Sequence, residues 1–462
     1  MASEWPRVRI SEVCELIVDC VNKTAPKSEF PTEFKMLRTP NVKNGRVDTS
    51  NCFYVTEDTY LKWTRRATVN KNDVLLTREA PLGEVGIVKS EEKLFLGQRL
   101  MQYRADQTKL DPDFLVYSFL SPDLQHQFRM HEGSGSVVSH IRVGDCSKFE
   151  INLPPLTTQK SIAKILGELD QRIELNRKTN QTLEQMAQAL FKSWFIDFDP
   201  VVDNALAAGN PIPDELAHRV KVRKKAHALA DFQLLPEHIR NLFPSEFEQT
   251  GEPTVGIYGW VPKGWHVSTT NDEFVIRGGS TPSTKNQDFW DGDIYWTSPK
   301  DLSGNDSKVL LDTSRKITDA GLAKITSGLL PLNTVLMSSR APVGYLALAK
   351  VPVAINQGYI ALLCEKNLTP EYTLLFLDSI MEEIKGISGG TTFAEISKKT
   401  FKGIKLLVPS TQVVEAFTTI AKVNYDKITD NVKQIESLIE TRDYLLPKLI
   451  SGEVSLGEGS HG

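Results

Sequence analysis

The sequence contains the same unit twice. When the chain is compared with itself, a weak but ordered similarity is found at offsets of 253 to 261 residues. The matching pairs are Trp5 with Trp265, residues 80–83 with 341–344, Gln98 with Gln357, residues 111–114 with 369–372, and residues 153–159 with 407–412. A solenoid is excluded, because its repeats are only about 20 to 45 residues long. The pattern therefore predicts a duplicated domain.

Each copy is predicted to be a strand-rich domain followed by a long helix. Short β-prone runs flank the turn-forming sequences Ala-Pro-Leu-Gly at 80–83 and Ala-Pro-Val-Gly at 341–344. Shorter helices are expected at 113–130 and 371–385, because a proline and an acidic residue stand at each start. We therefore expect an α+β fold with two mixed, strand-rich domains.

The two long helices carry a heptad pattern. Alternating steps of four and three residues follow an apolar seam along each helix, interrupted by a few polar residues. The seam residues are Ile162, Leu166, Leu169, Ile173, Asn176, Leu183, Leu190, Ile428, Asn431, Ile435, Leu438 and Leu445. Such a seam needs a partner, so the helices are expected to form an antiparallel coiled coil with a pseudo-two-fold between the copies. Asn176 and Asn431 occupy equivalent positions, where a buried Asn would fix the register.

These features predict six segments. They are a globular domain at 1–156, a helix at 157–196, a linker at 197–255, a second globular domain at 256–410, a second helix at 411–452 and a tail at 453–462. The linker has no counterpart after the second helix. It carries a basic cluster of Arg219, Lys221, Arg223, Lys224 and Lys225. This cluster is interpreted first as a solvated helix face, with a nucleic-acid or subunit contact as the alternative.

Composition excludes several classes of protein. Hydrophobic residues make up 40% and charged residues 24%, which is typical of a soluble globular chain. The formal charge of −4 indicates no overall preference for a polyanion but allows a local basic face. Five scattered cysteines without a Cys-x-x-Cys pair predict neither a zinc site nor disulfides, and they favour a cytoplasmic location. No long apolar run predicts a membrane span.

The usual catalytic motifs are missing from the sequence. It has no Gly-x-x-x-x-Gly-Lys-Ser/Thr loop, no His-Glu-x-x-His and no Gly-x-Ser-x-Gly elbow. Residues 152–155, Asn-Leu-Pro-Pro, differ from the Asn/Asp-Pro-Pro-aromatic motif of amino-methyltransferases, because Leu153 precedes the prolines and Leu156 follows them. We therefore expect a non-catalytic binding protein that holds no metal or cofactor itself.

The chain resembles the specificity subunits of type I restriction–modification systems over nearly its whole length. The most specific segments are LPPLTTQKSIAKILGELDQRIELNRK (153–178), LEQMAQALFKSWFIDFDPV (183–201), VPSTQ (408–412) and LIETRDYLLPKLISGEV (438–454). The resemblance implies that each globular domain is a target recognition domain for one half of a split double-stranded DNA sequence. It also implies that the helices space these domains and dock two modification subunits, which carry S-adenosylmethionine and methylate adenine. Restriction subunits would add an ATP- and magnesium-dependent nuclease.

Candidate DNA contacts are polar and basic residues in turn-rich parts of the two domains. Arginine suits guanine, and asparagine or glutamine suits adenine, in the major groove. In the first domain the candidates are Lys43, Asn44, Lys62, Trp63, Arg65, Arg66, Thr77, Arg78, Gln98, Arg99, Ser136, Ser139 and His140. In the second they are Trp296, Thr297, Ser298, Lys300, Ser339, Arg340, Asn356, Gln357, Thr391 and Thr392. For each single residue, a solvated loop position is an equally good interpretation.

Two other functions fit part of the pattern. A coiled-coil scaffold whose globular domains bind proteins would show the same repeat and helices. A self-sufficient methyltransferase is disfavoured because its motifs are absent, and S-adenosylmethionine binding by the isolated chain would be needed to support it. Specific binding to a bipartite duplex, together with a methyltransferase partner, would distinguish a DNA-recognition subunit from the scaffold.

Overall fold

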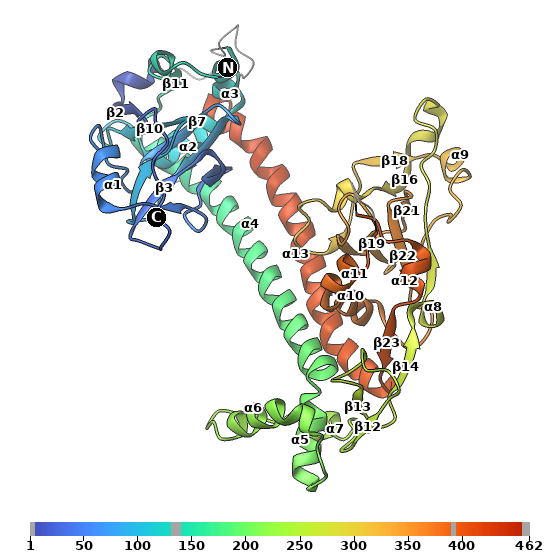
Figure 1. Cartoon of the computed structure of the whole chain (residues 1–462). Helices are drawn as coiled ribbons and strands as arrows, with labels where there is room; N and C mark the ends of the chain where they lie inside the picture. Colours follow the sequence, from blue (N-terminus) through green and yellow to red (C-terminus); the bar gives the residue numbers. More distant parts are fainter. Residues whose placement is uncertain (1–4, 131–139, 390–393, 455–462) are drawn as a thin grey trace, which may run out of the picture. The chain divides into compact units, whose positions relative to one another are not determined.

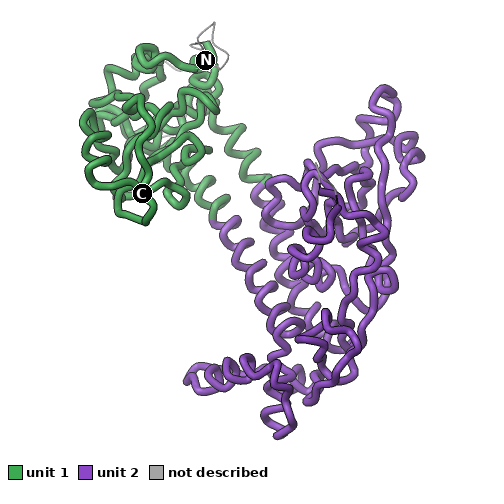
Figure 2. Tube along the Cα trace, viewed as in Figure 1, with its two compact units in different colours: residues 1–174, 436–462 green, residues 175–435 purple. Residues whose placement is uncertain are grey.

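The computed structural model describes residues 5–130, 140–389 and 394–454 (Figure 1). The chain forms two compact units (Figure 2), one of residues 1–174 with 436–462 and the other of residues 175–435. Each unit contains one globular domain and one part of each long helix, because the boundary falls within both helices rather than between the domains.

The globular domain of the first unit is built on a six-stranded sheet with the order β2-β10-β7-β8-β5-β4. These strands are β2 (Cys14–Asp19), β4 (Val42–Lys43), β5 (Gly45–Val47), β7 (Val74–Arg78), β8 (Leu82–Ile87) and β10 (Leu100–Ala105). A smaller sheet contains β6 (Phe53–Tyr54), β3 (Phe34–Leu37) and β9 (Lys93–Leu96), and β1 (Arg7–Arg9) pairs with β11 (Glu150–Asn152). The helices are α1 (Glu57–Trp63), α2 (Pro112–Leu120), α3 (Pro122–Met130) and the start of α4 (Leu156–Phe191). Fully buried Phe114, Phe119 and Phe128 on α2 and α3 join the core of the large sheet.

The second unit repeats this plan with a five-stranded sheet of order β15-β22-β19-β20-β17. Its strands are β15 (Val275–Arg277), β17 (Val309–Leu310), β19 (Val335–Ser338), β20 (Leu346–Ala349) and β22 (Tyr359–Leu363). Next come a sheet of β18 (Arg315–Ile317), β16 (Trp290–Thr297) and β21 (Ala354–Ile355), and the pair β14 (His266–Thr269) with β23 (Lys405–Val408). The helices are α8 (Thr270–Glu273), α9 (Asp319–Leu322), α10 (Pro370–Ser379), α11 (Met381–Gly386), α12 (Lys398–Lys402) and most of α13 (Thr411–Ser451).

Local geometry confirms the repeat. Thr77 Oγ1 accepts a hydrogen bond from the Glu84 amide at 2.9 Å, and in the second unit Ser338 Oγ accepts one from the Tyr345 amide at 2.8 Å. Both pairs close the turn whose sequence is Ala-Pro-x-Gly. The last residue of this turn has a positive φ in both units, 88° at Gly83 and 108° at Gly344. This conformation favours glycine, which explains why the residue is the same in both copies.

The helix expected over 113–130 is interrupted in the structure. Ser121 has φ −66° and ψ 151°, so α2 ends at Leu120 and α3 begins at Pro122. Proline disfavours the helical conformation of the residue before it, which accounts for the break. The helix expected over 371–385 is likewise two helices, α10 and α11, which meet at Ile380.

The segment 197–255 is folded onto the second unit. It contains α5 (Asp199–Ala208), α6 (Ala217–His227), α7 (Glu237–Arg240) and β12 (Phe247–Gln249), and β12 pairs with β13 (Trp260–Pro262). Phe198, Val201 and Val202 are fully buried in the same core as Trp194 of the π-helical turn that ends α4. The start of this segment therefore belongs to the unit's hydrophobic core.

The long helices α4 and α13 pack together and run antiparallel. In the second unit, Asn431 Nδ2 donates to Asn180 Oδ1 at 2.8 Å. In the first unit, Arg442 Nη1 lies 3.0 Å from Asp170 Oδ1. Residues later in α13 therefore contact residues earlier in α4, which shows that the two helices are antiparallel.

The heptad seam lies on the paired faces of the helices. Ile162, Leu166, Ile173, Ile428 and Asn431 are buried, and Leu169, Asn176, Leu183, Leu190, Ile435, Leu438 and Leu445 are half-buried. Apolar residues off the seam are exposed, with Leu175 at 64% and Met186 at 56%. The buried asparagine pair is Asn180 with Asn431, whereas Asn176 is half-buried and donates to Gln434 Oε1 at 2.8 Å.

We expect the Asn180–Asn431 pair to be strongly coupled. Asn431→Leu should lower the free energy of unfolding by about 1–3 kcal/mol, because the buried Asn180 amide loses its partner. The double variant Asn180→Leu/Asn431→Leu should regain most of that loss, since both polar groups are gone. Urea denaturation of the wild type, the two single variants and the double variant measures the coupling. The variant Asn176→Leu, at a half-buried position, is a control with a small expected effect. Additive losses in the double variant would contradict this account.

Candidate nucleic-acid interface

Several loops of the first unit meet at one end of its large sheet. Met101 near the start of β10 pairs with Asp19 at the end of β2, and Leu100 pairs with Thr77 near the end of β7. The loop after β2, the turn after β7 and the loop before β10 therefore lie side by side where these three neighbouring strands begin or end, along the edge of the sheet formed by the strand ends. We call this edge, with the loop 20–25 and the side chains around it, the first sheet edge.

Three of the candidate residues contact the loop after β2. Gln98 Oε1 accepts a hydrogen bond from Thr24 Oγ1 at 3.3 Å. Trp63 Nε1 donates to the Lys23 carbonyl at 3.3 Å, and Arg66 forms an ion pair with Asp19. The structure thus brings Gln98 to the same place as Trp63 and Arg66, which lie more than 30 residues before it in the sequence.

Arg78, Arg99 and His140 lie at the neighbouring part of the same edge. Arg99 Nε forms an ion pair with Glu79 at 2.8 Å, and Arg78 Nη1 donates to the Ile141 carbonyl at 3.0 Å. The Ile141 amide returns a hydrogen bond to the Arg78 carbonyl at 2.9 Å, which brings the adjacent His140 to this strand end. The candidates Ser136 and Ser139 lie outside the described residues.

Four further candidates of the first unit are exposed. Lys43 and Asn44 form the turn between β4 and β5, where Asn44 has φ 52°. Lys62 is at the end of α1, and Arg65 Nε donates to its carbonyl at 2.9 Å. All four side chains are accessible to a ligand, but no hydrogen bond or ion pair among the described residues joins them to the Thr24–Gln98 pair.

The second unit has an equivalent edge, which we call the second sheet edge. Thr281 Oγ1 donates to Gln357 Oε1 at 2.8 Å, as Thr24 does to Gln98. Trp296 Nε1 donates to the neighbouring Ser280 carbonyl at 3.3 Å. Neither threonine was among the candidates. The sequence could have identified these two threonines as equivalent, because each closely precedes a proline and they are separated by the repeat offset.

A cavity of about 370 Å³ opens at the second sheet edge. Its lining includes four of the candidates and is formed by Ser298, Pro299, Lys300, Ser303, Arg340, Ala341, Tyr345, Asn356 and Gly358. Lys300 is exposed and Arg340 is half-buried. Cationic donors beside an amide group are the chemistry that recognises base edges and phosphates.

Four candidates are interior residues. Thr77 and Thr297 are fully buried, and Thr297 Oγ1 lies 3.1 Å from the Tyr359 hydroxyl. Trp296 is 6% exposed, and Ser339 is 4% exposed. These side chains complete the domain core, so the candidate interface no longer includes them. Thr391 and Thr392 lie outside the described residues.

A cation at equivalent positions ties each domain to α4. Arg46 Nη1 lies 2.9 Å from Glu174 Oε2 in the first unit. In the second, Lys308 Nζ lies 2.6 Å from Glu184 Oε1 and 2.7 Å from an Asp378 oxygen. Burial raises the pKa of Glu184, although the nearby Lys308 opposes this shift. Both cations directly precede a valine, Val47 and Val309, but their partners could not be recognised without the fold.

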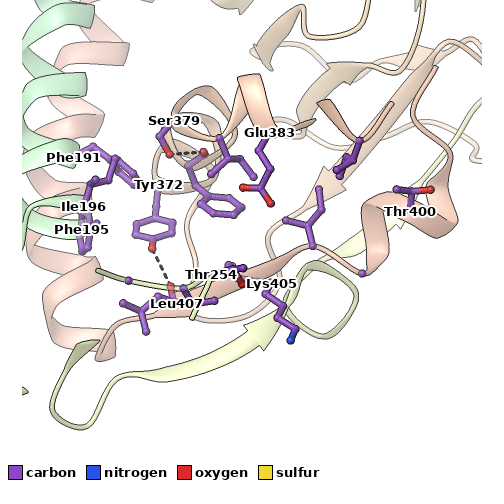
Figure 3. A pocket seen from close by; sticks show the side chains of 18 residues that line it. Phe191, Phe195, Ile196, Thr254, Tyr372, Ser379, Glu383, Thr400, Lys405 and Leu407 are labelled. Atoms are coloured by element: carbon purple, nitrogen blue, oxygen red, sulfur yellow. Dashed lines mark hydrogen bonds between the residues drawn. The ribbon is translucent and has the colours of Figure 1, made fainter. Parts of the chain in front are cut away.

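A larger cavity of about 470 Å³ lies elsewhere in the second unit, between the end of α4 and α10 (Figure 3). Phe191, Phe195 and Tyr372 line one side, and Glu383 and Lys405 lie farther along it. The Tyr372 hydroxyl donates to the Leu407 carbonyl at 3.2 Å. None of the candidate DNA contacts that the structure describes lines this cavity.

Two searches of the described residues were negative. No group of three or more His, Cys, Asp and Glu side chains in that part of the chain is arranged to hold a metal ion. No described helix combines the length and apolar character needed to cross a membrane.

The family model of the type I restriction modification DNA specificity domain matches residues 2–185 and 262–441. The chain belongs to this family. The double match confirms the internal repeat, and together the two ranges cover more than half of the chain. The fold and the family expected from the sequence are thereby confirmed.

One relative matches most of the length of this specificity subunit, and another matches less than half of it. It is 28% identical over 408 residues to the type I restriction enzyme HindI specificity subunit of Haemophilus influenzae, covering 84% of this chain and 88% of the relative. It is 34% identical over 198 residues to the MjaIX specificity subunit of Methanocaldococcus jannaschii, covering 42% and 44%. The crystal structure of an S subunit from M. genitalium has the same fold, with a TM-score of 0.55, 16% identity and coverage of 97% and 96%.

Proposed function

We propose that this specificity subunit recognises an asymmetric, bipartite DNA target, with one half bound by each globular domain. The observation that carries the proposal is the duplication of the sheet edge with different side chains on it. The Thr–Gln hydrogen bond is the same in both units. At the repeat offset of the Ala-Pro-x-Gly turn, however, the acidic Glu79 corresponds to the basic Arg340. Two equivalent scaffolds with different donors and acceptors suit two different half-sequences.

The paired helices are proposed to dock the modification subunits. Apolar side chains off the seam remain exposed on both helices, including Leu175, Met186 and, at 65%, Val423. These side chains are not used by the seam, so they are free to contact a partner protein. Methyl transfer from S-adenosylmethionine would occur in these partner subunits in the cytoplasm. ATP- and magnesium-dependent cleavage would occur in the restriction subunits.

Charge is consistent with shared DNA binding. The chain has 54 lysine and arginine residues against 58 aspartate and glutamate residues, so its net charge does not by itself attract a duplex. In the proposed complex the modification subunits share the phosphate contacts, and this chain supplies the side chains that recognise bases.

The proposal is tested by producing the chain with its modification subunits in a host that lacks the system. We expect modified adenines within two short sequences separated by a fixed gap of unspecified bases. Omission of the chain should abolish the modification. A continuous target, or modification that continues without this chain, would contradict the proposal. Arg340→Ala should weaken discrimination in one half only, by about 1–3 kcal/mol.

A further inference from the structure

Helix α6 carries cations on two opposite faces. Arg219, Arg223 and His227 are spaced by four residues and therefore follow one side of the helix. At about 100° per residue, Lys221, Lys224 and Lys225 fall within an arc of about 100° on the other side. The helix contains no acidic residue.

The arginine side of α6 is neutralised by α5. Arg219 Nη2 lies 2.5 Å from Asp199 Oδ1, and Arg223 Nε donates to Asp203 Oδ1 at 2.9 Å. His227 Nε2 lies 2.9 Å from the same Asp203 oxygen. We call these contacts between α5 and α6 the ladder. Asp199 and Asp203 are 5% and 6% exposed, so the ladder is largely shielded from water. The hydrogen bond to Asp203 raises the pKa of Arg223, which stays charged.

The ladder holds α6 on a firmly anchored support. Val201 and Val202 of α5 are fully buried in the core of the second unit, as is Leu216 directly before α6. Figure 1 shows α6 projecting from the rest of the unit beside α5. The outer face of α6 is therefore presented in a fixed orientation, without cover from other described elements of the unit.

The positive charges on the lysine side of α6 are not neutralised by acidic side chains among the described residues. Lys221, Lys224 and Lys225 are exposed, and none forms an ion pair or hydrogen bond with another described residue. His218 is exposed on the same side. Three free ammonium groups within about one and a half turns of helix form a concentrated positive patch in a chain whose formal charge is −4.

We propose that Lys221, Lys224 and Lys225 bind the phosphate backbone of double-stranded DNA without regard to sequence. Protein interfaces are enriched in arginine and depleted in lysine, whereas here the arginines face inward and the lysines face out. A lysine ammonium binds phosphate as a point charge and needs no fixed geometry. The proposal rests on the proposed function for the duplex itself, but it adds a contact outside the recognition domains.

The test measures the salt dependence of binding to a fluorescent duplex of random sequence by the full chain with its modification subunits. Each neutralised phosphate contributes about 0.9 to the slope of log Kobs against log salt concentration. The triple variant Lys221→Gln/Lys224→Gln/Lys225→Gln should therefore lose up to about 2.7 from this slope. The matched variant with arginine at the three positions should retain it. Both variants should keep the melting temperature of the wild type, because all three side chains are exposed.

The same variants distinguish this inference from the proposed function. Phosphate contacts carry no sequence information, so the glutamine variant should bind target and random duplexes more weakly by the same factor. An unchanged slope in the glutamine variant would overturn the inference. So would loss of the modification subunits from the purified complex with unchanged DNA binding, since α6 would then bind a protein. Equal affinity of the wild type for target and random DNA would instead refute the proposed function.

Discussion

Ile428→Asp is expected to unfold the second unit or to leave it insoluble. Ile428 is fully buried in α13 and belongs to the core formed with the end of α4 and the second globular domain. The substitution removes a packed side chain and places a carboxylate in a hydrophobic core that is closed to water. Losses of this kind exceed about 4 kcal/mol and are among the largest that single substitutions produce. Soluble yield and urea denaturation measure the effect.

Val423→Asp is the matched control for this experiment. Val423 lies on the same helix but is 65% exposed, so its substitution should change the free energy of unfolding by no more than about 0.5 kcal/mol. Because Val423 belongs to the proposed docking surface, this variant should instead bind the modification subunits more weakly. Equal destabilisation by the two substitutions would contradict the assignment of buried and exposed faces.

Matched insertions of four residues in the paired helices are expected to lengthen the gap between the two half-targets. The sites are after Lys178 in α4 and after Lys433 in α13. These sites face one another, because Asn176 bonds to Gln434 and Asn180 bonds to Asn431 on either side of them. Four residues add about one turn and about 6 Å, and they keep the seam approximately in phase. With B-DNA rising about 3.4 Å per base pair, the gap should grow by up to about two base pairs.

Insertions of two residues at the same sites are the control. They rotate the following part of each seam by about 200°, which places apolar side chains in water. We expect loss of assembly rather than a new spacing. The modified sequence of each variant provides the measurement. An active four-residue variant with an unchanged gap would show that the helices dock subunits without setting the spacing.

The features that could be predicted from the sequence depend on local pattern. The seam from Ile162 to Leu445 follows from heptad spacing, and the repeat of the Ala-Pro-x-Gly turn placed equivalent strands in both domains. The break at Ser121 was also a local signal, because a proline follows it, but the helical pattern on both sides obscured it.

The features that could not be predicted depend on contacts between distant segments. Asn431 pairs with Asn180 rather than Asn176 because of the axial alignment of the two helices. The sequence of neither helix specifies this alignment alone. The contact of Thr24 with Gln98 joins residues on two loops of one sheet edge. Thr77 and Thr297 have the polarity of surface residues, yet hydrogen bonds within the domain allow them to be buried.

The central claim is that each globular domain recognises its own half of the target, and a domain exchange tests it most directly. Residues 1–152 are replaced by the matching segment of a related specificity subunit, which keeps β1 paired with β11 within the transferred part. The modified adenines are then mapped in cells that contain the chimaera and the modification subunits. The account predicts that one half-sequence changes to that of the donor while the other half and the gap stay the same. A change in both halves, or in neither, would contradict it.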